Sequence, residues 1–203
     1  MKGLILIGGG GHCHACIDVI EREGKHRIAG ILDHPDRRGE EVLGYEILGG
    51  DDQIPGLIKE GHAFLITLGQ IQSPERRIAI FEQLQALGAE LISVVSPLAH
   101  LSPHAEIGVG TIVMHQALVN AKARVGANCI INSQALVEHD AVIEDHCHVS
   151  TGAKINGNAK LGRESFVGSG AILFHEIQVG AGSLIAAGVV VRRNKPPQAK
   201  VLL

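Results

Sequence analysis

Residues 107–191 carry an aliphatic side chain at every sixth position, without an insertion. Stepping by six from Ile107 gives fifteen Ile, Val or Leu residues and ends at Val191. Hydrophobic residues make up 45% of the chain, so chance would produce such a run about once in 10⁵ trials. Neither the period of a helix nor that of a simple strand explains it. A six-residue period is typical of a parallel β-helix, in which three hexads form one triangular coil.

The coil predicts which residues lie above one another. Residues eighteen apart stack about 4.8 Å from each other along the axis. The position after each aliphatic is often small or turn-forming, and we interpret these positions as corners, where a positive φ is frequent. They are Gly108, Asn120, Gly126, Asn132, Ser150, Asn156, Gly162, Gly168 and Gly180. Because aromatic residues make up only 2% of the chain, aliphatic side chains must fill the core almost alone.

The first half of the chain alternates short apolar segments with helix-like patterns. This alternation predicts a β-α-β unit with parallel strands. We therefore expect an α/β domain over residues 1–96 and a parallel β-helix over residues 97–203. The predicted strands are residues 3–7, 27–32, 63–68 and 91–95, and the predicted helices are residues 14–23 and 74–87.

Bulk composition excludes several classes of function. A net charge of −3 gives no broad surface for nucleic acid. No apolar stretch approaches the roughly 20 residues that span a bilayer. Residues 1–11 lack the long apolar region of a signal peptide. We expect a cytoplasmic protein with no nucleic-acid or membrane partner, whose four cysteines are reduced thiols.

Four stretches carry a resemblance to a known family: residues 8–12 (GGGGH), 31–34 (ILDH), 67–69 (TLG) and 132–152 (NSQALVEHDAVIEDHCHVSTG). Together with the hexads they resemble bacterial sugar acetyltransferases that join an N-terminal Rossmann-like domain to a left-handed β-helix. That branch includes nucleotide-aminosugar N-acetyltransferases of the PglD and NeuD type. The resemblance covers nearly the whole chain. It implies acetyl-CoA as co-substrate, no metal, and a homotrimer with active sites at its subunit interfaces.

The end of the chain departs from this family, whose members usually finish with a Gly-x-Pro-Ala-Lys turn. Only Pro197, Ala199 and Lys200 are reminiscent of that turn here. The contribution of the tail to CoA binding therefore stays open.

Acetyl transfer to an amine or hydroxyl needs a base for the acceptor proton and donors for the oxyanion. Histidine is the natural base near neutral pH. The segment Glu138-His139-Asp140 offers an imidazole between two carboxylates. Taken alone, His139 could equally be a polar residue on a solvated coil. The resemblance implies that His139 is the base and Asp140 its carboxylate partner.

The resemblance also implies contacts to acetyl-CoA or the acceptor. His148 lies nine residues after His139, on another side of the coil, so the two could meet across a trimer interface. Each of these residues also has an explanation that needs no ligand. The histidine could simply lie at an interface, the asparagine could simply form a corner, and the small residues are of a kind common throughout the repeat. The residues implied are Asn132, His148, Gly157, Ser169 and Ala187.

The glycine quartet at residues 8–11 follows a strand and precedes a helix. Its backbone N–H groups could receive a phosphate, although the full GxGxxG pattern is missing and a tight turn would explain the glycines equally. The resemblance implies that this region holds a nucleotide-sugar. The residues implied are Gly10, Gly11, His12, Asp33, His34 and Gly69.

Several functions remain in competition at this point. We expect N-acetylation of the 4-amino group of a nucleotide-linked sugar of the UDP-4-amino-trideoxyhexose type. O-acetylation of sialic acid and a non-catalytic β-helix that binds a nucleotide-sugar are the alternatives. A carbonic anhydrase would need three zinc histidines, and the spacing argues against it. The segment His12-Cys13-His14-x-Cys16 opens a helix, where its side chains would diverge, so we expect no metal there.

Overall fold

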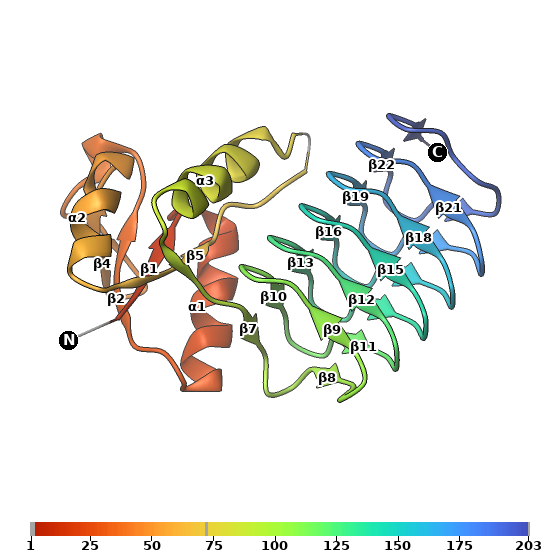
Figure 1. The fold of residues 1–203 in the computed structure, drawn as a ribbon, viewed down its shortest axis with the longest axis horizontal. Coiled ribbons are helices and arrows are strands. Elements are labelled where there is room, and N and C mark those ends of the chain that lie inside the picture. Colours follow the sequence, from red (N-terminus) through yellow and green to blue (C-terminus); the bar gives the residue numbers. More distant parts are fainter. Residues whose placement is uncertain (1–2, 72, 203) are drawn as a thin grey trace.

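The computed structural model describes residues 3–71 and 73–202, which form an α/β domain followed by an elongated three-sided coil (Figure 1). The order in the first sheet is β3-β4-β2-β1-β5-β6. All of its neighbouring strands are parallel except β3 and β4. The elements of this domain are β1 (Leu4–Ile7), α1 (Gly11–Glu23), β2 (Ile28–Leu32), η1 (Pro35–Arg37), β3 (Glu41–Val42), β4 (Tyr45–Gly49), η2 (Asp51–Gln53), α2 (Ile54–Lys59), β5 (Ala63–Ile66), α3 (Glu75–Ala86) and β6 (Glu90–Leu91).

The first three predicted strands and both predicted helices are confirmed, with α1 beginning at Gly11 rather than at residue 14. The single strand predicted at residues 91–95 is wrong. The Ile92 N–H donates to Phe64 O, whereas the Val94 N–H donates to Thr111 O. The chain therefore leaves one sheet and enters another within these residues. Residues 41–59 gave no prediction, yet they form β3, β4 and α2.

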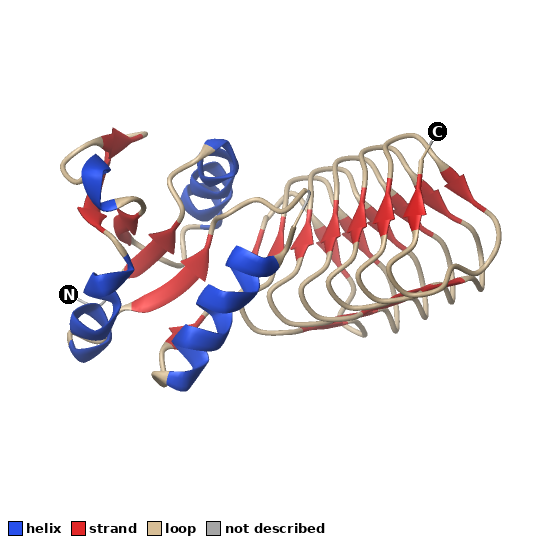
Figure 2. Cartoon of the chain, turned by 90° about the horizontal axis from the view of Figure 1, so that it is seen from above, coloured by secondary structure: helices blue, strands red, loops and turns tan. Residues whose placement is uncertain are grey.

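The second half is a left-handed parallel β-helix built from three sheets, which we call the β10, β11 and β12 sheets (Figure 2). The β10 sheet consists of β7 (Val94–Val95), β10 (Ile112–Val113), β13 (Ile130–Ile131), β16 (His148–Val149), β19 (Phe166–Val167), β22 (Leu184–Ile185) and β24 (Lys200–Val201). The β11 sheet consists of β8 (His100–Leu101), β11 (Leu118–Val119), β14 (Leu136–Val137), β17 (Lys154–Ile155), β20 (Ile172–Leu173) and β23 (Val190–Val191). The β12 sheet consists of β9 (Glu106–Ile107), β12 (Arg124–Val125), β15 (Val142–Ile143), β18 (Lys160–Leu161) and β21 (Gln178–Val179).

The hexad aliphatics point inward, as the repeat predicts. Those from Val113 to Val191 are at most 4% exposed. Strands pair in the eighteen-residue register, for example Val113 with Ile131 and Val137 with Ile155. The last step is shorter, because Leu184 pairs with Lys200 across only sixteen residues, and the segment between them contains two consecutive prolines.

The expected reason for the corner glycines is wrong. Positive φ falls three positions after the aliphatic, as at Gln134 (φ 60) and Asp140 (φ 59), and not directly after it. The glycines after the aliphatic are required by close packing instead. A Cβ on Gly108 would lie 2.5 Å from Ala127 N, and one on Gly162 would lie 2.4 Å from Ala181 N. The backbone of the next coil occupies the space of the side chain.

The interior of the β-helix has a hydrophobic core of its own, and a second buried cluster joins the two halves of the chain. Helix α1 contributes Cys13 and Ile17 to a buried cluster that includes the outward-facing Val94, Ile112 and Ile130 of the β10 sheet. Figure 1 shows α1 between the first sheet and the early coils. The α/β domain thus covers the first coils of this sheet, and its Gln70 reaches His148, the next residue of the column.

All four cysteines are free and buried. Within residues 3–71 and 73–202, no helix combines the length and apolarity needed to cross a bilayer.

Substituting an inward aliphatic should destabilise the coil. Leu161→Ala removes a side chain with 0% exposure, and we expect a loss of about 2–5 kcal/mol in the free energy of unfolding, measured with urea. Lys160→Ala, on the exposed side of the same strand, should change it by less than about 0.5 kcal/mol. Equal effects of the two substitutions would contradict the inward orientation of the hexad aliphatics.

Candidate active site

His139 lies at the corner between β14 and β15, with its side chain 55% exposed. Its Nδ1 is 2.9 Å from Asp140 Oδ2. Asp140 has a positive φ of 59 at this corner, which is a left-handed backbone conformation. A carboxylate at Nδ1 fixes the proton of the neutral ring on that atom, so Nε2 is left as the basic nitrogen of the ring.

Two neighbours hold this imidazole in place. Glu138 accepts hydrogen bonds from the His139 N–H and from Asn120 Nδ2, and these bonds lower the pKa of its carboxyl. Gly157 lies one coil further on, where a Cβ would be 2.8 Å from Cε1 and Nε2 of His139. The ring therefore packs directly on the Gly157 backbone, and any side chain there would have to displace it.

His148 and Asn132 form a second polar group on the neighbouring side of the coil. His148 Nδ1 is 2.5 Å from Gln70 O, so it donates to this carbonyl. Its Nε2 then accepts from Asn132 Nδ2 at 3.1 Å, while Asn132 Oδ1 accepts from the Ser133 N–H. Burial lowers the pKa of His148 to about 4, against the opposing effect of the Gln70 carbonyl. His148 is thus a neutral hydrogen-bond acceptor that orients Asn132.

His12 belongs with this second group. Its ring centroid is 6.4 Å from that of His148. Burial lowers the pKa of His12 to about 3, with smaller contributions from the charges of Arg77 and His148. Its Nε2 is buried and has no hydrogen-bond partner among the residues that the structure describes. A Cβ on Gly69 would lie 3.6 Å from the His12 Cβ, so Gly69 and His12 are neighbours.

Gly8 and Gly9 use their N–H groups within the protein, bonding to Leu32 O and to Asp33, so Gly10 and Gly11 are the candidates in this turn for binding a ligand. Gly10 caps α1 without a side-chain hydrogen bond, and a Cβ on Gly10 or Gly11 would meet no atom within 4 Å. The N-terminus of a helix attracts phosphate. Asp33 supports the turn by accepting from the Gly9 N–H at 2.8 Å and from Arg37 Nη1 at 2.6 Å. Its other oxygen accepts from the His34 N–H, so its hydrogen bonds go to the protein itself.

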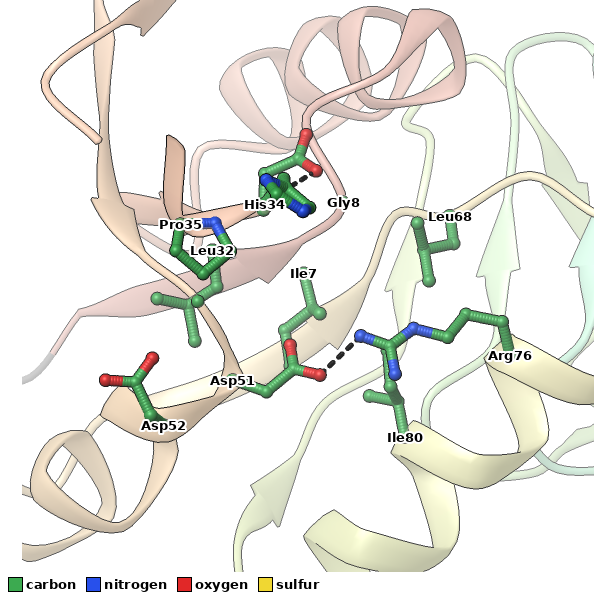
Figure 3. A pocket seen from close by; sticks show the side chains of 12 residues that line it. Ile7, Gly8, Leu32, His34, Pro35, Asp51, Asp52, Leu68, Arg76 and Ile80 are labelled. Atoms are coloured by element: carbon green, nitrogen blue, oxygen red, sulfur yellow. Dashed lines mark hydrogen bonds and ion pairs between the residues drawn. The ribbon is translucent and has the colours of Figure 1, made fainter. Parts of the chain in front are cut away.

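A cavity of about 440 Å³ opens beside this turn, at the carboxyl ends of β1 and β2 (Figure 3). Its walls mix aliphatic side chains with charged ones, and His34 lies at its rim with its side chain 69% exposed. This is the position where open α/β sheets bind ligands. The lining residues are Ile7, Gly8, Leu32, Asp33, His34, Pro35, Gly50, Asp51, Asp52, Leu68, Arg76 and Ile80.

The remaining predicted residues, Ser169 and Ala187, lie at the Asn132 corner of later coils and not at the His139 corner. Ser169 Oγ is 3.1 Å from Ser150 Oγ, and Ala187 N lies against Gly168. The sequence-predicted residues therefore form two groups within one chain. One contains His139, Asp140 and Gly157, and the other contains Asn132, His148, His12 and Gly69. Gly10, Gly11, Asp33 and His34 belong to the glycine turn and its surroundings.

The sequence analysis predicted no role for three buried polar residues, each at most 2% exposed. They are Gln70, Arg77 and Asn128. Arg77 Nη1 donates to Ile66 O and Leu68 O at 2.8 Å, and its Nη2 donates to Asn128 O in the β-helix. Burial lowers the pKa of Arg77 to about 10, which leaves it charged at neutral pH. An arginine in an amphipathic helix ordinarily lies in water, so only the contact between the domains reveals its role.

No group of three or more His, Cys, Asp or Glu side chains in residues 3–71 and 73–202 is arranged to hold a metal ion. All three lie on α1, where His14 is exposed, whereas Cys13 and Cys16 are on the buried side of the helix. Burial raises the pKa of the Cys13 thiol to about 11.

Comparison with known proteins agrees with this architecture. The sequence profile of the PglD N-terminal domain matches residues 3–84. A histidine-to-asparagine mutant of perosamine N-acetyltransferase from Caulobacter crescentus, solved with CoA and GDP-perosamine, is 28% identical, and the match covers 98% of this chain and 93% of that one with a TM-score of 0.92. The acetyltransferase domain of PglB from Neisseria gonorrhoeae is 30% identical, with coverage of 97% and 94% and a TM-score of 0.86. A search of curated proteins gave no match.

The fold and its match to these solved structures define an acetyltransferase of the hexapeptide-repeat class. Within this class, the match of residues 3–84 to the PglD N-terminal domain points to the enzymes that carry such a domain before the β-helix. The chain belongs to the PglD-like family of sugar N-acetyltransferases.

The buried histidines should make the fold sensitive to acid. Since the pKa of His148 falls from 6.5 to about 4 on folding, the unfolded chain binds more protons between these values. The contribution is complete above pH 6.5 and is lost as the pH falls toward 4, by up to about 3 kcal/mol. We expect the free energy of unfolding to drop between pH 7 and pH 5, and to drop less in His148→Gln. His14→Gln, on the exposed side of α1, should retain the wild-type drop, and an unchanged slope in His148→Gln would contradict this account.

Proposed function

We propose that the protein transfers the acetyl group of acetyl-CoA to the amino group of a nucleotide-linked amino sugar. The observation that carries this proposal is the hydrogen bond between His139 Nδ1 and Asp140, which leaves Nε2 as the basic nitrogen of a half-exposed side chain. The relatives support it, because one is a perosamine N-acetyltransferase with CoA and GDP-perosamine, and the PglB domain is also known in complex with acetyl-CoA. The cavity lined by Gly8, Asp33 and His34 supplies space for a nucleotide.

The geometry supports a direct transfer. The neutral amine attacks the thioester carbonyl, and a C–N bond forms as His139 Nε2 accepts the amine proton. Asp140 stabilises the resulting imidazolium through Nδ1. The C–S bond then breaks, the imidazolium returns its proton to the sulfur, and free CoA and the acetamido sugar leave.

We further propose a homotrimer with its active sites between subunits. Two observations support it. The catalytic pair and the Asn132-His148 group are separate in one chain, and each would complete the other across an interface. The β11 sheet also presents outward-facing aliphatic side chains that a second copy would cover. They are Leu118, Leu136, Ile172 and Val190.

Acetyl-CoA and nucleotide-sugars are both cytoplasmic metabolites, so we place the reaction in the cytoplasm as a step of glycan assembly. O-acetylation of sialic acid is the second candidate. The cavity of about 440 Å³ at the glycine turn favours a nucleotide-linked acceptor, since free sialic acid has no diphosphate for it to hold.

The reaction is tested by thiol release from acetyl-CoA with UDP- and GDP-linked amino sugars and free sialic acid. We expect turnover with a nucleotide-linked amine, and a fall in kcat of about 10²–10⁴-fold in His139→Asn with CoA binding retained. His175→Asn, at the same corner two coils further on, serves as control. Turnover only with sialic acid would establish the second candidate, and tight binding without turnover would establish a non-catalytic protein.

The shared active site is tested by mixing two inactive variants. Gly11→Asp places a carboxylate where a phosphate would bind and suits a helix N-terminus, so the fold should persist. We expect mixed oligomers of His139→Asn and Gly11→Asp chains to regain part of the activity, because some interfaces then join an intact histidine to an intact turn. Light scattering should give the mass of a trimer. Absence of recovery in verified mixed oligomers would place the whole site within one subunit.

A further inference from the structure

The cavity beside the glycine turn has a second polar end that the transfer reaction does not use. Gly8 and His34 lie on one side of the cavity, and Asp51, Asp52 and Arg76 lie on the opposite side (Figure 3). The aliphatic side chains of Ile7 and Leu32 line the space between them. This arrangement suits a molecule with phosphates at one end and a flat polar ring at the other.

The carboxylates at the two ends differ in how many of their oxygens are bonded to the protein. Asp33 is held by the Gly9 N–H, by the His34 N–H and by Arg37, so it shapes the turn. Asp51 forms an ion pair with Arg76 through Oδ2 only, and Asp52 accepts from Gln53 Nε2 through Oδ2 only. In the part of the chain that the structure describes, no protein donor reaches the second oxygen of either carboxylate.

We propose that this end of the cavity binds guanine, so that the sugar substrate is linked to a guanosine diphosphate. This inference rests on the proposed function and specifies its substrate. Guanine presents one acceptor, O6, beside two donors, N1–H and the N2 amino group. The Arg76 guanidinium supplies donors for O6, and the carboxylates of Asp51 and Asp52 supply acceptors for the two donors.

Other bases match this end less well. Uracil presents its single N–H between two carbonyl oxygens, so one of these would face a carboxylate. Cytosine and adenine place a ring acceptor where guanine has N1–H. The resemblance of the sequence favoured uridine, and the carboxylates of the cavity favour guanine instead.

The inference is tested by calorimetric titration of the intact protein with GDP, inosine diphosphate and UDP. Inosine lacks only the N2 amino group, so this probe removes one contact without altering the protein. We expect GDP to bind about tenfold or more tightly than UDP, with inosine diphosphate between them. Asp51→Asn and Asp52→Asn together should reduce the preference for GDP over UDP to less than threefold.

Asp36→Asn provides the matched control, because this exposed carboxylate does not line the cavity and should leave the preference unchanged. Tighter binding of UDP would overturn the guanine inference and leave the proposed function standing. A preference for GDP that survives in the double variant would also overturn the guanine inference and leave the proposed function standing. No binding of any diphosphate would overturn the nucleotide-linked substrate itself.

Discussion

The geometry of the candidate site depends on one buried cation between the two domains. The Arg77 guanidinium is 2% exposed, and it bonds to the carbonyls at the end of β5 and to Asn128 in the β-helix. A buried charge is costly unless it is well hydrogen-bonded, so these carbonyls cannot move freely away from it. The segment that follows β5 is thereby fixed above the coil, and its Gln70 carbonyl reaches His148. Arg77 thus links the packing of the domains to the surroundings of His148, whose pKa is lowered mainly by burial and in smaller part by the Arg77 charge.

The two groups of polar residues have opposite electrostatic settings. His139 is largely exposed beside a carboxylate, which suits proton transfer. His148 and His12 are buried, and burial keeps both neutral at physiological pH. A neutral His148 can orient the Asn132 amide without adding a positive charge beside it. The coil separates these settings by placing the residues on different sides, so one chain can hold both without mutual interference.

The sequence predicted the coil well, because its hydrophobic period is determined by contacts between residues at fixed separations. The stacking of Gly157 on His139 follows from the same count of eighteen. The corner glycines were misinterpreted, since a repeat shows where small residues occur but not whether φ or close packing requires them. The contacts of Arg77, Gln70 and Asn128 could not be predicted, because each depends on how one domain sits on the other.

The shortened final step of the β10 sheet affects how another molecule could stack on the end of the coil. A solenoid of identical coils ends in open backbone donors and acceptors onto which another molecule could stack. Here the last step spans sixteen residues instead of eighteen, and it passes through Pro196 and Pro197, neither of which has an N–H group. The last described coil is therefore not a copy of the coils before it, and it offers fewer backbone donors to a stacking molecule than a regular coil would.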